Sequence, residues 1–300
     1  MRRTSFAATV VVFISALSMA TAFATPPTGD AKFTDYARVQ AVDSASVPIS
    51  GGTNLAMGLY SIAAGGETGW RSLPGHMVLA VTKGKLMLHG GEGCATKEYA
   101  AGQAATVPAG TYLVHNTGSE PLEFFGAFLE QPVGAPKPLA EGPTAPAPAG
   151  CTGVMAAAAP SGVSINHPLA GTVSTAFYSH HASLDVKSGK DMYAGTYDFG
   201  PGWSSGWISH RPALNIVEAG SLGYVEAKNG KCDESEYYTA GQAFYHPAHR
   251  HMAYTKGSEH LLLTTIYFDL PHDTPLPVIG NTITAVDFTQ APPADCMRLR

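Results

Sequence analysis

Residues 58–72, GLYSIAAGGETGWRS, return later in the chain as GTYDFGPGWSSGWIS at residues 195–209, and the two stretches align without a gap. A second pair aligns in the same way, YAAGQAATVPA at 99–109 and YTAGQAFYHPA at 238–248. Self-similarity of this kind is the signature of a repeated structural unit. The sequence therefore predicts two copies of one domain.

A proline-rich segment, PVGAPKPLAEGPTAPAPAG (132–150), lies between the copies. Repeated prolines interrupt both helices and strand ladders, so the segment is either an extended linker or an arm that wraps around a domain. We therefore expect an N-terminal domain at 31–153 and a C-terminal domain at 158–300.

Within each copy, short apolar or alternating runs are broken about every 8 to 12 residues by Gly, Pro or Asn-Thr-Gly turns, a spacing typical of all-β domains. No segment keeps a 3.6-residue period over the length of a useful helix. Each copy is therefore predicted to be a small antiparallel barrel or sandwich. Examples of the runs are MVLAV (77–81), KLMLH (85–89), LEFFGAFL (122–129) and LLLTTIYF (261–268).

The composition restricts the possible partners. Charged residues make up 14% of the chain and the net charge is −5, without a cluster of Lys and Arg. This balance argues against nucleic acid as the main partner. Beyond the N-terminal region, no segment approaches the ~18 continuous apolar residues of a membrane-spanning helix. We therefore expect no membrane span once the N-terminal segment is removed.

That N-terminal segment has the features of a secretory signal. Arg2 and Arg3 precede an almost wholly apolar run that ends in Ala22-Phe23-Ala24, which fits the small-x-small rule for signal peptidase. We expect residues 1–24 to be a signal peptide cleaved after Ala24, and the protein to be secreted or periplasmic. The alternative is a retained N-terminal helix.

Each copy holds two cysteines at matching places, one before the Tyr…Ala-Gly-Gln turn and one near the end of the domain. Four cysteines allow three pairings, and the duplication favours pairing within each domain. Export makes oxidation the expected state, with free buried thiols as the alternative. The expected disulfides are Cys94–Cys151 and Cys232–Cys296.

The second repeated stretch and the residues after it resemble the second motif of the cupin family. Gly102, Pro108, Gly110 and Asn116 occupy the motif positions in the first copy, and Gly241 and Pro247 occupy two of them in the second. The resemblance covers most of the chain beyond residue 30. It implies an all-β protein of two tandem cupin-type antiparallel β-barrels, similar to jelly rolls.

In typical cupins, two His of a first motif and one His of the second converge on a divalent metal inside the barrel, often with a Glu. In the N-terminal copy these three His positions fall on Arg71, Leu73 and Tyr112. None of the three is a normal ligand for such a site. The resemblance therefore implies a metal-free N-terminal barrel.

In the C-terminal copy, the same three positions fall on Ile208, His210 and His251. His249 lies two residues before His251, and alternate residues of a strand share a face, so His249 is expected to supply a third nitrogen. By the same rule, His246 is expected to point to the other face. The sequence thus predicts a site in one barrel only.

The Glu of the first motif aligns near Ala213, so the carboxylate ligand is expected to be missing, with Glu218 as a distant candidate. The predicted ligands are His210, His249 and His251, for one divalent ion among Zn, Mn, Fe, Ni and Cu. The alternative interpretation of these histidines is a hydrogen-bonded remnant of an ancestral site.

Three functions stay open from the sequence. The first is a metal-dependent cupin enzyme of the oxygenase, isomerase or lyase type acting on a small molecule. The second is a non-catalytic binding protein of the cell envelope, with Trp70, Arg71 and Tyr112 lining a barrel mouth that holds an anionic or sugar-like ligand. The third is a structural bicupin. The sequence identifies neither the substrate nor the oligomeric state.

Overall fold

The computed structural model describes residues 27–134, 137–151, 153–154, 156, 159–175, 182–228, 231–272, 278–279, 282–283, 286–287 and 296. The expected signal peptide, residues 1–24, lies outside the described residues.

The first twenty strands of the described chain come ten from each copy. The first copy contributes β1 (Ala31–Ala41), β2 (Ala45–Ile49), β3 (Asn54–Glu67), β4 (Arg71–Leu73), β5 (Met77–Lys83), β6 (Lys85–Gly90), β7 (Ala95–Ala100), β8 (Gln103–Val107), β9 (Gly110–His115) and β10 (Leu122–Gln131). The second contributes β11 (Ser161–Val173), β12 (Ala182–Val186), β13 (Asp191–Phe199), β14 (Ser204–His210), β15 (Ala213–Ala219), β16 (Ser221–Lys228), β17 (Lys231–Thr239), β18 (Gln242–His246), β19 (Arg250–Thr255) and β20 (Leu261–Leu270). The short strands β21 (Val278–Ile279), β22 (Thr282–Ile283) and β23 (Val286–Asp287) follow.

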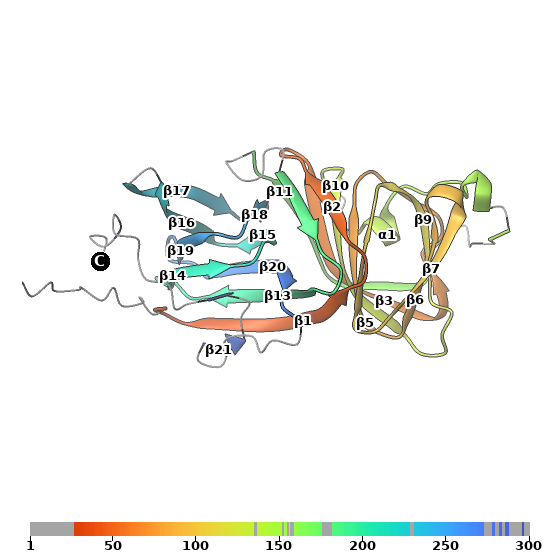
Figure 1. Cartoon of the computed structure of the whole chain (residues 1–300), viewed down its shortest axis with the longest axis horizontal. Coiled ribbons are helices and arrows are strands. Elements are labelled where there is room, and N and C mark those ends of the chain that lie inside the picture. The colour runs from red at the N-terminus through yellow and green to blue at the C-terminus, as the bar shows by residue number, and fades with distance from the viewer. Residues whose placement is uncertain are drawn as a thin grey trace, which may run out of the picture.

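The strands form two barrels that lie side by side (Figure 1). In the C-terminal barrel, one sheet contains β13, β20, β15 and β18, and the facing sheet has the order β17-β16-β19-β14. The N-terminal barrel repeats this arrangement with β3, β10, β5 and β8 against β4, β9, β6 and β7. The predicted all-β fold of two tandem antiparallel barrels is confirmed.

Helices are a minor component of the described chain: α1 (Pro138–Glu141) and the 3-10 turns Glu92–Cys94 and Ala149–Cys151. Within the described residues, we find no helix of the length and apolarity needed to cross a membrane.

The first strand of each copy crosses to the other barrel. β1 pairs with β13 from Ala31 to Gln40, and only its last residues, Gln40 and Ala41, pair with β8 of its own copy. β11 correspondingly pairs with β3 along most of its length and with β18 at its end. One continuous sheet therefore passes through both barrels.

The exchanged strands explain a pair of glycines in the repeat. A Cβ atom added to Gly195 would lie 2.2 Å from Cζ of Phe33, on the exchanged strand β1. A Cβ added to its counterpart Gly58 would lie 3.2 Å from Cγ2 of Ile165, on β11. Both glycines therefore make room for a side chain from the other copy.

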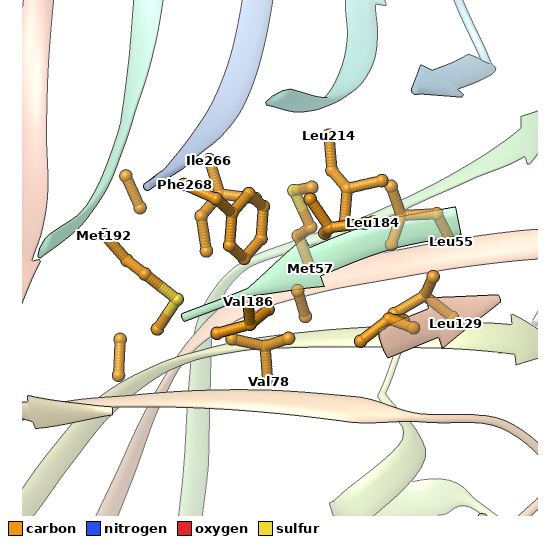
Figure 2. Close-up of a cluster of buried hydrophobic side chains, with 14 of the residues drawn as sticks. Leu55, Met57, Val78, Leu129, Leu184, Val186, Met192, Leu214, Ile266 and Phe268 are labelled. Atoms are coloured by element: carbon orange, nitrogen blue, oxygen red, sulfur yellow. The ribbon is translucent and has the colours of Figure 1, made fainter. Parts of the chain in front are cut away.

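A shared apolar core joins the barrels (Figure 2). It contains buried side chains from both copies, and β2 pairs with β12 beside it. Each fully buried Leu, Ile, Val, Met or Phe stabilises the fold by about 1.5–3 kcal/mol relative to exposure. Members labelled in the figure are Leu55, Met57, Val78, Leu129, Leu184, Val186, Met192, Leu214, Ile266 and Phe268. Each barrel has a second apolar cluster of its own.

Both predicted disulfides are confirmed. Cys94 pairs with Cys151 across 5.1 Å between Cα atoms, and Cys232 pairs with Cys296 across 5.0 Å. No cysteine is left free. Disulfides of this kind are typical of proteins in an oxidising, extracellular environment.

Candidate metal centre

Three histidines meet inside the C-terminal barrel, each from a different strand. His210 ends β14, His246 ends β18, and His251 is the second residue of β19. One ring nitrogen from each lies within 4.8 Å of the others. His246 and His251 are buried, with 0% and 1% of their surfaces exposed, and His210 is partly buried.

The expectation for His246 was wrong. Strand alternation holds only along one uninterrupted strand, and here the chain leaves β18 after His246 and starts β19 at Arg250. Pro247 lies in the break between them, consistent with the inability of proline to donate to a ladder. The break redirects the chain, so His246 points at His210, and the His246 Nδ1 to His210 Nε2 distance is 2.9 Å.

A carboxylate is also present, which the sequence comparison missed. Glu226 on β16 pairs in register with His251 on β19, and its side chain is buried. Its Oε1 atom lies 2.6 Å from Nε2 of His249 and 3.9 Å from Nε2 of His246. Glu226, His246 and His249 form a second group whose candidate ligand atoms lie within 4.8 Å of one another. Glu226 lies 13 positions after Ala213, where the Glu of the first motif aligns, so the motif does not indicate it. The pairing of β16 with β19 is what places Glu226 beside the histidines.

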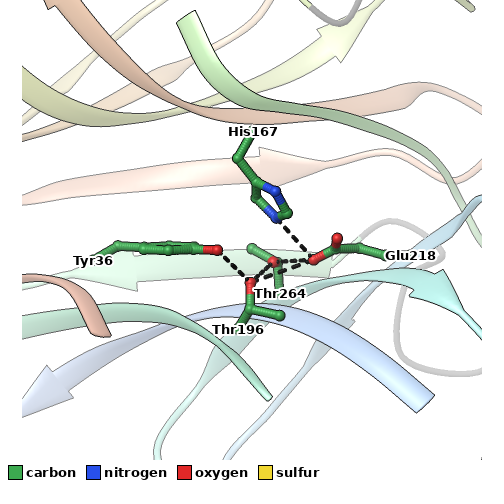
Figure 3. A network of polar contacts seen from close by, with 5 residues as sticks. All are labelled: Tyr36, His167, Thr196, Glu218 and Thr264. Atoms are coloured by element: carbon green, nitrogen blue, oxygen red, sulfur yellow. Dashed lines mark hydrogen bonds and ion pairs between the residues drawn. The ribbon is translucent and has the colours of Figure 1, made fainter. Parts of the chain in front are cut away.

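Glu218, the distant candidate, belongs to a different network (Figure 3). Its Oε1 accepts hydrogen bonds from Thr196 and Thr264 and lies 3.1 Å from Nε2 of His167. Tyr36 on β1 joins the network through Thr196. Glu218 therefore helps to hold the exchanged strands β1 and β11 in place.

The hydrogen bonds define a tautomer for His210. Its Nδ1 lies 2.6 Å from the carbonyl oxygen of Arg211, so this nitrogen carries the proton and donates it. In the neutral ring, Nε2 then has a lone pair and accepts from Nδ1 of His246. His210 therefore turns a coordinating nitrogen toward the centre of the cluster.

The surroundings keep these rings neutral. Burial, followed by the repulsion of His249, lowers the pKa of His210 to about 4, although its hydrogen bond to the backbone opposes the change. Burial and the neighbouring imidazoles lower the pKa of His246 and of His251 well below the ordinary value. Neutral imidazole is the form that coordinates metals.

The donors fit a divalent ion. Three equally spaced ligands at about 2.0–2.2 Å from one ion are at most ~3.8 Å apart. The three nitrogens here lie within 4.8 Å of one another, and two of them, His210 Nε2 and His246 Nδ1, are 2.9 Å apart, so small side-chain adjustments would bring them around one ion. Nδ1 of His251 is buried and has no hydrogen-bond partner among the described residues. A buried polar atom in this state is costly, and a metal bond would satisfy it.

Aromatic rings enclose the cluster. Tyr224 stacks on His246 with ring centroids 4.5 Å apart, and Tyr267 meets His210 edge-on at 5.6 Å. His249 has 22% of its side chain exposed, and His210 is also only partly buried. The cluster therefore borders solvent at these two residues.

The N-terminal barrel lacks these donors at the matching places. Gly90 pairs with Tyr112 as Glu226 pairs with His251, and Leu73 matches His210 on the preceding strand. The repeat aligns Val107 with His246. Glycine, leucine and valine have no side-chain group for a metal. The four counterparts of the site are Leu73, Gly90, Val107 and Tyr112.

The residues expected to line a ligand-binding mouth have different surroundings. Trp70 packs against Leu113 and the disulfide-bonded Cys151. Arg71 is buried and donates to the carbonyl oxygens of Thr68, at 3.0 Å, and Gly142, at 2.6 Å. Since Gly142 lies in the proline-rich segment, that segment wraps along β4 as an arm. Of the expected residues Trp70, Arg71 and Tyr112, the last borders a cavity of about 160 Å³.

The fold thus consists of two all-β barrels, and the C-terminal barrel holds a cluster of His and Glu side chains. The sequence matches no protein-family model and none of the curated proteins. Solved structures that it resembles include a tryptophan-to-tyrosine variant of oxalate decarboxylase from Bacillus subtilis, with 14% identity, 79% of this chain and 78% of that chain covered, and a TM-score of 0.33. Another is an oxalate decarboxylase described for its substrate binding mode and reaction specificity, with 13% identity, coverage of 88% and 89%, and a TM-score of 0.33. A third is the Bacillus subtilis enzyme at pH 4.6, with 14% identity, coverage of 79% and 78%, and a TM-score of 0.32. These matches concern the fold at most.

Proposed function

We propose that this chain is an exported two-barrel protein that binds one divalent metal in its C-terminal barrel and uses it to handle a small molecule. The observation that carries the proposal is the convergence of His210, His246 and His251, three imidazoles kept neutral, with no hydrogen-bond partner for Nδ1 of His251 among the described residues. The N-terminal barrel, with Leu73, Gly90, Val107 and Tyr112 at the matching places, is proposed to be metal-free.

This ligand set modifies the one expected from the sequence, His210, His249 and His251. His246 replaces His249 among the primary ligands because it is fully buried and belongs to both donor groups. His249 and Glu226 are then proposed as a pair beside the ion. Imidazole donors suit Zn, Fe, Ni and Cu, and a carboxylate extends the range to Mn.

A metal held here would supply a Lewis acid for a small oxygen-bearing substrate. Glu226 and His249 are placed to move a proton, because Oε1 and Nε2 are 2.6 Å apart and His249 reaches solvent. Nδ1 of His249 donates to the carbonyl oxygen of Pro247 at 2.9 Å, which fixes the orientation of the ring. Tyr224 and Tyr267 limit the access of water.

The metal content of the purified protein tests the proposal. Protein prepared without chelator or affinity tag should contain about one equivalent of a transition metal, or take up one on titration with Zn²⁺, Mn²⁺, Cu²⁺ or Ni²⁺. His251→Ala should abolish binding, whereas Tyr112→Phe, in the other barrel, should leave it unchanged. Less than about a tenth of an equivalent with no uptake would contradict the proposal and leave a metal-free binding or structural role.

A further inference from the structure

The backbone of His210 is held differently from that of His251. His251 lies within β19, and the strands on both of its sides, β14 and β16, pair with it at Ile208 and Glu226. The pairing of β14 with β19 stops one residue before His210, which is the last residue of β14. Among the described residues, the ladder partner of His210 is Val286 on β23, close to the end of the chain. A strand from outside the barrel therefore supports this proposed ligand.

The N-terminal barrel supports the matching residue from within. Leu73, the counterpart of His210, pairs with Gly110 at the start of β9. The counterpart of Gly110 in the repeat is His249, which lies just before β19 and outside its ladder. The C-terminal barrel thus lacks the pairing on this edge of β14, and β23 supplies a pairing on the other edge.

The segment that contains β23 is the second copy of the proline-rich arm. TAPAPAGC (144–151) and TQAPPADC (289–296) align without a gap, with Thr, Pro-Ala and Cys in the same places. In the first copy the arm lies along β4, where Ser72 N donates to the carbonyl oxygen of Pro143 at 3.1 Å. In the second copy β23 lies along β14, the counterpart of β4. Each barrel therefore has an arm on the same edge, followed by a cysteine.

A disulfide anchors the C-terminal arm, β23 with Cys296, to the barrel. Cys296 lies nine residues after Asp287, the last residue of β23, and is bonded to Cys232 on β17. It is buried against Trp207, three residues before His210 on β14. A very short strand near a chain end frays unless it is tied down. Loss of the disulfide therefore frees the strand that pairs with His210.

We infer that the C-terminal arm positions His210 for the metal, so that the ion is held tightly only while the Cys232–Cys296 disulfide is intact. The arm fixes the backbone of His210, and the ring on that backbone turns Nε2 toward Nδ1 of His246 at 2.9 Å. Support of this kind governs how well a ligand binds its ion. The oxidised chain therefore binds the ion more tightly than the reduced chain. The inference rests on the proposed metal centre.

The Zn²⁺ affinity of the full-length oxidised protein, measured by competition with a chromogenic chelator, tests the inference. Cys232→Ser/Cys296→Ser should weaken Zn²⁺ binding about 10- to 100-fold, the usual effect of losing the support of a ligand. Cys94→Ser/Cys151→Ser is the matched control, because that disulfide joins residues 57 positions apart, against 64, in the other barrel. The control should leave the affinity unchanged.

A second set of variants tests whether the arm acts through His210. In a His210→Ala background, loss of the Cys232–Cys296 disulfide should weaken Zn²⁺ binding no further, because the ligand that the arm positions is already absent. Equal weakening in both backgrounds would overturn the inference, since the disulfide would then act on the fold as a whole. Val286→Pro/Asp287→Pro keeps the disulfide but disrupts the pairing with β14, and should weaken binding as the loss of the disulfide does.

Circular dichroism verifies that the variants are folded, and if Cys232→Ser/Cys296→Ser unfolds, Val286→Pro/Asp287→Pro decides the question. If the unchanged protein takes up no Zn²⁺, the proposed function fails and the arm has no ion to position. If the unchanged protein binds Zn²⁺ and the folded arm variants bind it equally well, the proposed function stands and the inference alone is overturned.

Discussion

His246 belongs to both donor groups of the C-terminal barrel, so its removal should affect metal binding more than the removal of His249. We predict that His246→Ala abolishes binding, as His251→Ala does. His249→Ala should retain the ion with an affinity about 10- to 100-fold lower, the usual effect of losing a supporting residue. His260→Ala is the matched control, since His260 is exposed and pairs with Asp198 outside the cluster. Zn²⁺ titration measures all four variants, and full binding by His246→Ala would refute the assignment.

The buried histidines also make stability depend on pH. In the unfolded chain a histidine titrates near its ordinary value of about 6.5, while burial lowers the pKa of folded His210 to about 4. Between these values the unfolded state binds more protons, so stability falls as the pH drops from about 6.5 toward 4. His210 alone should cost on the order of 3 kcal/mol by pH 4, and His246 and His251 add to this loss.

Denaturant unfolding of the metal-free protein at pH 7.5 and pH 5 measures this effect. His210→Asn should flatten the dependence, and bound Zn²⁺ should raise stability at pH 7.5 more than at pH 5, because protons compete for the imidazoles. A stability that does not change with pH would show that these rings stay exposed to water.

The sequence predicted that His210 and His251 lie together because both fall on motif positions, and their ring centroids are 4.9 Å apart. It missed His246 and Glu226 for separate physical reasons. Alternation fails for His246 because the chain changes strands at Pro247. Glu226 is linked to His251 by strand register, a contact between residues 25 positions apart that no local pattern encodes.

The exchange of β1 and β11 explains why glycine occurs at the same position in both copies, which the alignment of the repeat does not explain. Alignment detected Gly58 and Gly195 as matching residues, but the strand that packs over each one comes from the other copy. Short apolar runs predicted the strands, since alternation is a local property. Which barrel a strand joins depends on contacts distant in sequence, so the exchange was beyond prediction.

Gly195→Ala should therefore destabilise the protein. Its Cβ would lie 2.2 Å from Phe33 Cζ and 2.4 Å from the carbonyl oxygen of Thr34, and backbone atoms cannot move aside easily. We expect a loss of about 1–3 kcal/mol, as for other overpacked sites. Gly200→Ala is the control, because its Cβ would meet Asp30 at an ordinary 3.5 Å. Denaturant unfolding of both variants compares them, and equal stabilities would argue against close packing of β1 on β13.

For the whole molecule, cleavage of the signal peptide and oxidation of the cysteines can be measured in one experiment. We predict that the mature chain starts at Thr25 and contains no free thiol, since all four cysteines are paired. Intact-mass analysis under non-reducing conditions provides the measurement. Retention of Met1, or four alkylatable cysteines in the native exported protein, would contradict export and oxidation.

The strands that the two copies exchange determine whether each copy can fold alone. Residues 31–153 and 158–300 each contain a full set of strands and a disulfide, which is why the sequence predicts that each half folds alone as an oxidised β protein. In the intact chain, however, β1 and β11 lie on the opposite barrels, and the core in Figure 2 draws its side chains from both halves.

A half expressed alone must therefore return its first strand to its own barrel and expose its part of the shared core. We expect each half to unfold at a lower temperature than the intact protein, and a mixture of the two to form a 1:1 complex that regains most of the difference, because exchange of equivalent strands restores the same contacts. Calorimetry and light scattering of the halves, alone and mixed, measure this. Two halves that unfold independently, at the temperature of the intact chain and without associating, would mean that the shared core contributes little to stability.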